Sequence, residues 1–188
     1  MRLVPHYASF ILWLLCYGPC TGAGEVQRAD IVYNDGFYRL DFDAVLNGRY
    51  EVIHALVSDY PNLHQLSDAV QESEILESTR PGEQRLRFVS EVCLLIFCFR
   101  KSLVVDVTEA PGGVFNATVV PHLCDFKSGH GTWRFAAAGP SRTAVHYSGV
   151  QQPAFWIPPV IGPYLLKRKL VKEAIKTINK LEHLANNA

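Results

Sequence analysis

The sequence has no excess of charge of either sign. Its 188 residues include 18 Lys and Arg and 18 Asp and Glu, so the formal net charge is zero. Domains that bind nucleic acid usually carry a strongly basic face, and this balance argues against such a partner. Internal repeats, low-complexity runs and long linkers are also missing from the sequence. A single domain is therefore the simplest interpretation.

No apolar run is long enough to cross a membrane, which takes about 20 residues. The longest, Tyr7–Tyr17, follows the positive charge of Arg2 and is followed by small residues around Ala23. These are the three zones of a cleavable secretion signal. We therefore expect residues 1–23 to be removed and residues 24–188 to form one exported domain, either periplasmic or secreted.

Patterns typical of catalytic and metal sites are missing too. The sequence has no Ser-His-Asp order, no HExxH and no CxxC, and its histidines lack metal-ligand spacing. We therefore expect no metal site and assign no catalytic residue. Four separate side chains could still act as acids or bases in a cyclase or dehydratase, and they keep that alternative open. They are Glu109, Asp125, His130 and His146.

Cysteine is scarce. Cys16 and Cys20 belong to the expected signal, and their neighbours do not favour a lipid anchor. Cys93, Cys98 and Cys124 remain, an odd number, so at most one bridge forms within an exported chain. We predict a Cys93–Cys98 disulfide across the base of a hairpin, with Cys124 as a free thiol. The alternative is a continuous bent strand that carries three buried thiols.

Alternation of apolar and polar residues is what the sequence has in abundance. It predicts a first strand over residues 37–46, then a short helix near residues 50–59 and one further helical turn around residues 63–66. About six strands joined by hairpins follow, and hairpin connections make the sheet antiparallel. Their expected positions are residues 70–79 and 84–95, followed by segments around Val105, Ala117, Phe135 and Val145.

The last segment is helical, because its apolar residues recur every three or four positions from Leu166 to Ala185. About 22 residues give a helix roughly 33 Å long, enough to cover a whole sheet. The predicted fold class is thus α+β. A curved antiparallel sheet of about six or seven strands surrounds a long C-terminal helix, and two short helices follow the first strand. Such a sheet wrapped around one helix encloses a space.

Three segments carry a family resemblance. They are LVSDYPNLHQL (Leu56–Leu66), VVPHLCDFKSGHGTWRF (Val119–Phe135) and QQPAFWIPPVIGPYLLKRKL (Gln151–Leu170). They resemble the helix-grip fold of the START and polyketide-cyclase superfamily (SRPBCC), and specifically its exported bacterial coenzyme Q-binding START-domain proteins. The resemblance implies a cavity for an apolar ligand, with a quinone, a lipid or a polyketide among the occupants. It implies no cofactor other than such a bound molecule.

Eight side chains are the expected ligand contacts. Five aromatic residues should point to the concave face of the sheet, where core packing and cavity lining both place them inside. Phe155 and Trp156 precede the helix, either as a staple that seats it or as a lip that touches a membrane. The basic run Lys167–Lys169 could then face anionic headgroups. The full set is Phe88, Phe115, Trp133, Phe135, Tyr147, Phe155, Trp156 and Leu170.

The function predicted from the sequence is binding or carriage of an apolar molecule outside the cytoplasm. The expected partners are an apolar small molecule and a membrane surface, with no nucleic acid. Two alternatives stay open at this point. One is a cyclase or dehydratase that acts on an apolar substrate, and the other is a protein-interaction module without a usable cavity.

Overall fold

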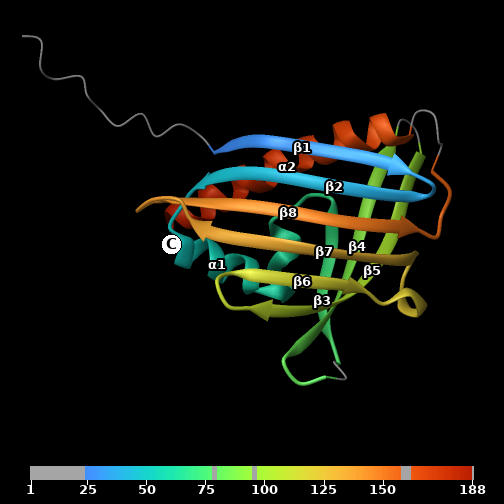
Figure 1. The fold of residues 1–188 in the computed structure, drawn as a ribbon, viewed down its shortest axis with the longest axis horizontal. Coiled ribbons are helices and arrows are strands. Elements are labelled where there is room, and N and C mark those ends of the chain that lie inside the picture. Colours follow the sequence, from blue (N-terminus) through green and yellow to red (C-terminus); the bar gives the residue numbers. More distant parts are fainter. Residues whose placement is uncertain (1–23, 78–79, 95–96, 158–161, 188) are drawn as a thin grey trace, which may run out of the picture.

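The fold is known from a computed structural model that describes residues 24–77, 80–94, 97–157 and 162–187. The predicted signal, residues 1–23, lies outside the described residues. Within the described part, eight strands, two α-helices and two 3-10 helices follow one another along the chain (Figure 1). In chain order they are β1 (Glu25–Asn34), β2 (Phe37–Asn47), α1 (Tyr50–Ser58), η1 (Tyr60–Gln65), β3 (Val70–Leu76), β4 (Glu83–Leu94), β5 (Phe97–Ala110), β6 (Val114–Val119), η2 (Pro121–Leu123), β7 (Phe126–Ala137), β8 (Arg142–Pro153) and α2 (Gly162–Asn187).

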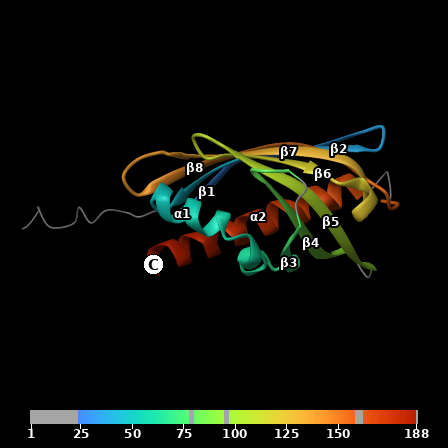
Figure 2. The same cartoon turned by 90° about the horizontal axis from the view of Figure 1, so that it is seen from below.

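All eight strands belong to one antiparallel sheet in the order β1-β2-β8-β7-β6-β5-β4-β3. Every neighbouring pair is adjacent in sequence except β2 and β8, whose register places Phe42 opposite Tyr147. Figure 2 shows α2 lying beneath the sheet, with β3, β4 and β5 turned toward the side on which α2 lies. The predicted helix-grip fold is confirmed.

The sheet has eight strands rather than the six or seven expected, because the sequence analysis missed β1. Consequently the two short helices follow β2, which is the second strand. The β1–β2 turn has positive φ angles at Asp35 (47°) and Gly36 (82°). Asp-Gly is a strong signal for a two-residue hairpin turn. The sequence pattern did not predict β1, because it is an edge strand whose residues are mostly polar or exposed.

α2 covers the predicted helical segment and extends slightly beyond it at both ends. Its 26 residues span about 39 Å. The apolar stripe predicts that Leu170, Ala174, Ile178 and Leu181 are buried; Ile178 and Leu181 are, whereas Leu170 and Ala174 are only partly buried. The stripe therefore meets close-packed core in its second half and a less filled space earlier.

The hydrophobic core lies at the end of the sheet where α1 packs against the second half of α2 (Figure 2). Ile53 of α1 has no exposed surface, and Leu46 of β2 is 1% exposed. Glu182 of α2 accepts backbone hydrogen bonds from Asn47 at 2.6 Å and Gly24 at 3.1 Å. These contacts fix one half of the helix against the strands and leave its first half to bound a cavity.

No helix in the described ranges combines the length and apolar composition needed to cross a membrane.

Candidate functional site

A cavity of about 670 Å³ lies between the concave face of the sheet and α2. Strands β1, β2 and β4 to β8 supply its walls, the region from α1 to β3 supplies one side, and α2 closes the other. Most side chains that line it are aliphatic or aromatic. Pockets for small molecules usually measure about 300–1,000 Å³ and have a mainly apolar lining with a few polar groups. The space therefore has the size and chemistry of a ligand site.

All eight side chains predicted as ligand contacts line this cavity. Phe115 and Phe135 are each 5% exposed and belong to the core, whereas Trp133 is 38% exposed. Their degree of burial thus differs although they share one face. The sequence could not separate core from lining, and the structure shows a gradation from one to the other.

The aromatic lining is continuous across three strands. Phe115 meets Phe135 edge to face at 5.8 Å, and Trp133 lies parallel to Phe135 at 6.2 Å. Tyr147 of β8 completes the series, with its ring 4.3 Å from that of Trp133. Aromatic rings at such separations attract one another, which adds stability beyond that from burying their apolar surface. The lining is therefore a preformed apolar wall.

Tyr147 lies over two glycines that face each other on β7 and β8, Gly131 and Gly149. A Cβ on Gly149 would come within 2.3 Å of the Tyr147 hydroxyl, and one on Gly131 within 2.8 Å. The two glycines therefore provide the space for this ring. Burial, followed by the charge of Asp41, raises the pKa of Tyr147 to about 12, so the phenol is neutral at physiological pH.

Phe155, Trp156 and Ile157, the segment ahead of α2, all line the cavity. Phe155 packs edge to face on Phe126 at 5.7 Å, and the Lys101 ammonium lies 4.9 Å from the centre of its ring. Trp156 is 73% exposed. Phe155 thus anchors the segment to the sheet, as a staple would, while Trp156 has most of its surface in solvent, and its contact with a membrane stays a prediction.

The basic run at the start of α2 is partly paired. Lys167 forms an ion pair with Asp30 of β1 at 3.6 Å, and Lys169 pairs with Glu173 at 3.5 Å. Arg168 is exposed. Among the three basic residues, Arg168 is therefore the one without an ion pair to another described residue. Contact of this run with anionic headgroups stays a prediction.

Several polar residues that line the cavity were not predicted from the sequence, and the most buried charged residue among them is Glu173, which is 7% exposed. Its Oε1 accepts a hydrogen bond from the Lys176 ammonium at 3.3 Å and forms an ion pair with that of Lys169 at 3.5 Å. Its Oε2 has no hydrogen-bond partner among the described residues. A glutamate between lysines on a helix is typical of a solvated surface, so no signal in the sequence identified it.

The four acid–base candidates are not assembled into one site. Glu109 forms a hydrogen bond with His54 at 2.7 Å, and His146 forms one with Asp43 at 2.5 Å. Asp125 accepts a hydrogen bond from the Ser102 backbone N–H at 2.8 Å. The fourth, His130, lines the cavity. Its side chain points away from the face that carries Gly131 and Trp133, which face the cavity, so the imidazole lies on the outer face of β7.

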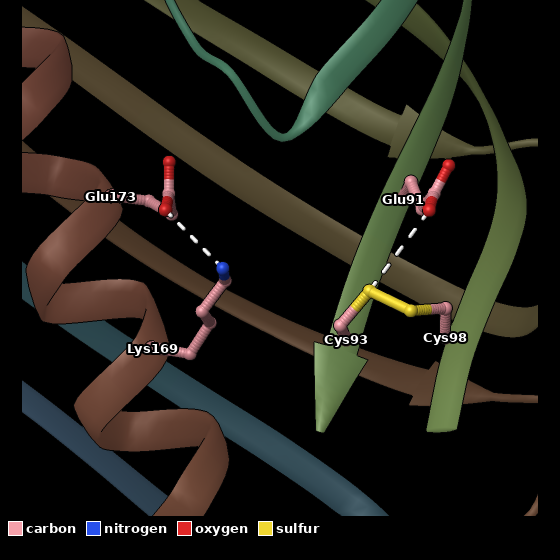
Figure 3. The surroundings of a disulfide bond; sticks show 5 residues. All are labelled: Glu91, Cys93, Cys98, Lys169 and Glu173. Carbon is pink, nitrogen blue, oxygen red and sulfur yellow. Dashed lines mark hydrogen bonds and ion pairs between the residues drawn. A yellow bond between two sulfur atoms is a disulfide. The ribbon is translucent and has the colours of Figure 1, made fainter. Parts of the chain in front are cut away.

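A disulfide joins Cys93 of β4 to Cys98 of β5, which face each other in the register of the hairpin (Figure 3). Both residues are exposed, and Cys124 is a free, partly buried thiol. The bent-strand alternative with three thiols is not what the structure shows. Glu91, Cys93 and Cys98 also form the one group of metal-ligand types found in the described ranges, but their sulfur atoms are bonded to each other.

This arrangement of sheet, helix and cavity defines a helix-grip protein. The family described as polyketide cyclase/dehydrase and lipid transport matches residues 42–188, and the chain belongs to it. It is a member of the START and polyketide-cyclase superfamily that the sequence segments indicated. No curated protein sequence matches the chain significantly.

Solved structures with the same fold include both enzymes and lipid-transfer proteins. The Zhui aromatase/cyclase from a Streptomyces species has a TM-score of 0.63 at 13% identity, covering 80% of this chain and 94% of its own. A START superfamily protein from Mycobacterium smegmatis has a TM-score of 0.61 at 16% identity, with coverages of 79% and 97%. A STAR-related lipid transfer protein from Xanthomonas axonopodis reaches 0.55 at 16% identity, with coverages of 83% and 98%. At these identities the likeness concerns the fold.

Proposed function

We propose that this protein binds and carries an apolar small molecule, a quinone, a lipid or a polyketide-like compound, in the cavity between its sheet and α2. The observation that carries the proposal is the cavity itself, about 670 Å³ with a mainly apolar lining. Trp133 supports it, because a large aromatic side chain on the concave face is 38% exposed. A bound apolar molecule would cover that surface and gain the free energy of its burial.

The cavity favours a carrier over the two alternatives. An interaction module would need no internal space of this size. A cyclase or dehydratase would need acid and base groups around the substrate, and three of the four candidates are bonded to partners away from the cavity lining. The coenzyme Q-binding subtype belongs to this proposal and rests on the resemblance in sequence.

We further propose that the protein works outside the cytoplasm. The signal-like pattern of residues 1–23 supports this location. The exposed Cys93–Cys98 disulfide supports it as well, because such bonds persist in oxidising compartments and are rare in the cytosol.

Extraction of the purified protein with organic solvent, followed by mass spectrometry, tests the carrier function. We expect an apolar compound in a stoichiometric amount. In the variant Ala174→Phe a larger side chain on α2 fills part of the cavity, so it should carry much less. Ala55→Phe on the exposed side of α1 is the matched control and should carry as much as the wild type. Equal amounts in wild type and Ala174→Phe, or none in either together with no uptake of added pyrene, would refute the proposal.

A further inference from the structure

In the described part of the chain, four buried side-chain atoms have no hydrogen-bond partner: Ser58 Oγ, Glu83 Oε1, Ser102 Oγ and Glu173 Oε2. Among these four residues, Glu173 is the one that lines the cavity. A buried polar atom without a partner is uncommon in native proteins, and at a cavity wall it indicates a group that a ligand can satisfy.

A second glutamate on α2 shows how this fold normally satisfies a buried carboxylate. Glu182 is 8% exposed, close to the 7% of Glu173. Its Oε1 accepts from the Asn47 backbone and its Oε2 from the Gly24 backbone, so both oxygens have donors. Glu182 lies outside the cavity lining. Both glutamates lie on α2 and are almost equally buried. They differ because one oxygen of Glu173 lacks a donor and because Glu173, unlike Glu182, adjoins the cavity.

We propose that Oε2 of Glu173 accepts a hydrogen bond from a hydroxyl group on an otherwise apolar ligand. This inference rests on the proposed carrier function and specifies the ligand class. Figure 3 shows Glu173 projecting from α2 into the space between the helix and the β4–β5 hairpin, beside Lys169. A hydrogen bond to a charged, desolvated oxygen is stronger than one between neutral groups.

The charges around Glu173 favour a neutral donor over a cation. Lys169 and Lys176 already bring two ammonium groups to its other oxygen, at 3.5 and 3.3 Å. A third positive charge from an amine ligand would meet both of them. An ionised fatty acid offers no donor and would bring a carboxylate next to a carboxylate. The fitting class is therefore an apolar alcohol or phenol.

A carboxylate that needs a donor also distinguishes between the two redox forms of a quinone ligand. An oxidised quinone presents carbonyl oxygens, which accept hydrogen bonds and have nothing to donate to Glu173. Its reduced form, a quinol, carries two hydroxyl groups and satisfies the carboxylate. If the ligand is a quinone-like molecule, we expect the quinol to bind more tightly than the quinone.

Displacement of pyrene measures the preference directly. Pyrene fluoresces, is apolar and has no hydrogen-bond donor, so its binding reports the cavity without involving Glu173. Hexadecanol and hexadecyl methyl ether then compete with it, and they differ in the hydroxyl hydrogen and one methyl group. We expect the alcohol to bind about ten to a hundred times more tightly than the ether, the range for a hydrogen bond to a charged group.

Variants assign that preference to one side chain. Glu173→Leu should still bind pyrene, with whatever affinity the more apolar wall gives, and should prefer the ether or neither competitor. Glu173→Gln keeps the size of the side chain, serves if the leucine variant fails to fold, and should retain only a few-fold preference. Glu182→Gln is the matched control and should keep the full preference for the alcohol.

The outcomes separate this inference from the carrier function. Absence of pyrene binding to the wild type would overturn both. Pyrene binding with equal displacement by alcohol and ether would overturn the role of Glu173 and leave the carrier function standing. A preference that survives in both Glu173 variants would also overturn it.

Discussion

At the scale of single residues, the cavity exists because some large side chains on the concave face are incompletely covered. Phe135 and Trp133 both point from β7 to this face, two positions apart, yet they are 5% and 38% exposed. Replacing a large side chain by a small one lowers the free energy of unfolding most where the surroundings are close-packed. The two residues therefore form a natural comparison between core and lining.

We expect Phe135→Ala to lower the free energy of unfolding by about 3–5 kcal/mol, the usual cost for a close-packed aromatic residue. Trp133→Ala should cost about 2 kcal/mol or less, because much of its surface contacts the cavity rather than protein. The same variant should bind pyrene more weakly. Urea unfolding and pyrene titration measure the two effects. A larger loss of stability in Trp133→Ala than in Phe135→Ala would contradict the assignment of Trp133 to the lining.

The phenol of Tyr147 gives a second residue-scale prediction. Its pKa is raised to about 12 in the fold, mainly by burial, against a usual value near 10. The folded state therefore holds this proton more tightly than the unfolded state, and the resulting stability is complete below pH 10. As the pH rises from 10 to 12, the free energy of unfolding should fall by about 2 kcal/mol on account of this group.

The variant Tyr147→Phe keeps the ring over the two glycines and has no proton to lose. Its stability should fall less steeply than that of the wild type between pH 10 and 12, as measured by urea unfolding at a series of pH values. Titration of the remaining groups is common to both proteins and cancels in the comparison. Parallel curves across that interval would show that Tyr147 is not the buried phenol.

The sequence identified the aromatic residues of the cavity but not its carboxylate, for a physical reason. Alternation along a strand assigns Trp133 and Tyr147 to one face, whatever fills the space in front of them. Glu173 differs, because whether a glutamate beside an apolar stripe is solvated or buried depends on how far the sheet curves over the helix. The sheet curvature depends on how all eight strands pair and on where α2 lies under them, and the residues around Glu173 specify neither.

At the scale of elements, the β4–β5 hairpin was predicted with its disulfide, because the tip residues Leu94–Phe97 lack the glycine, asparagine, aspartate or proline of ordinary turns. Residues 95 and 96 lie outside the described residues. β1 went unpredicted although Asp35-Gly36 signals the turn that follows it. An edge strand needs only one partner and no buried face, so its composition can stay polar.

The disulfide leads to a prediction about the hairpin. In protein without residues 1–23, and so without Cys16 and Cys20, alkylation of the unreduced, denatured chain followed by intact-mass analysis should add one label, on Cys124. The double variant Cys93→Ser, Cys98→Ser should lose about 2 kcal/mol of stability, the value for so short a loop in the chain-entropy model. Reduced wild type should match the variant. Three labels without reduction would rule out the bond.

At the scale of the whole molecule, α2 is linked to both ends of the sheet. Lys167 pairs with Asp30 on the edge strand β1, and Lys176 pairs with Asp68, two residues before the other edge strand, β3. Glu182 adds backbone hydrogen bonds near the start of β1 and the end of β2. These contacts place the helix under the sheet without filling the space between them, which allows an apolar cavity to persist in a stable fold.

The pairing of β2 with β8 has a consequence for how the chain folds. Phe42 must find Tyr147, and nearly all the other strands lie between them in sequence. Contacts so distant in sequence carry a large loop-closure cost and slow folding. The hairpins from β3 to β7 can form early, whereas β2 keeps one edge unpaired until β8 has been synthesised. During that interval the exposed edge can pair with another chain, so aggregation of nascent protein is the main hazard of this topology.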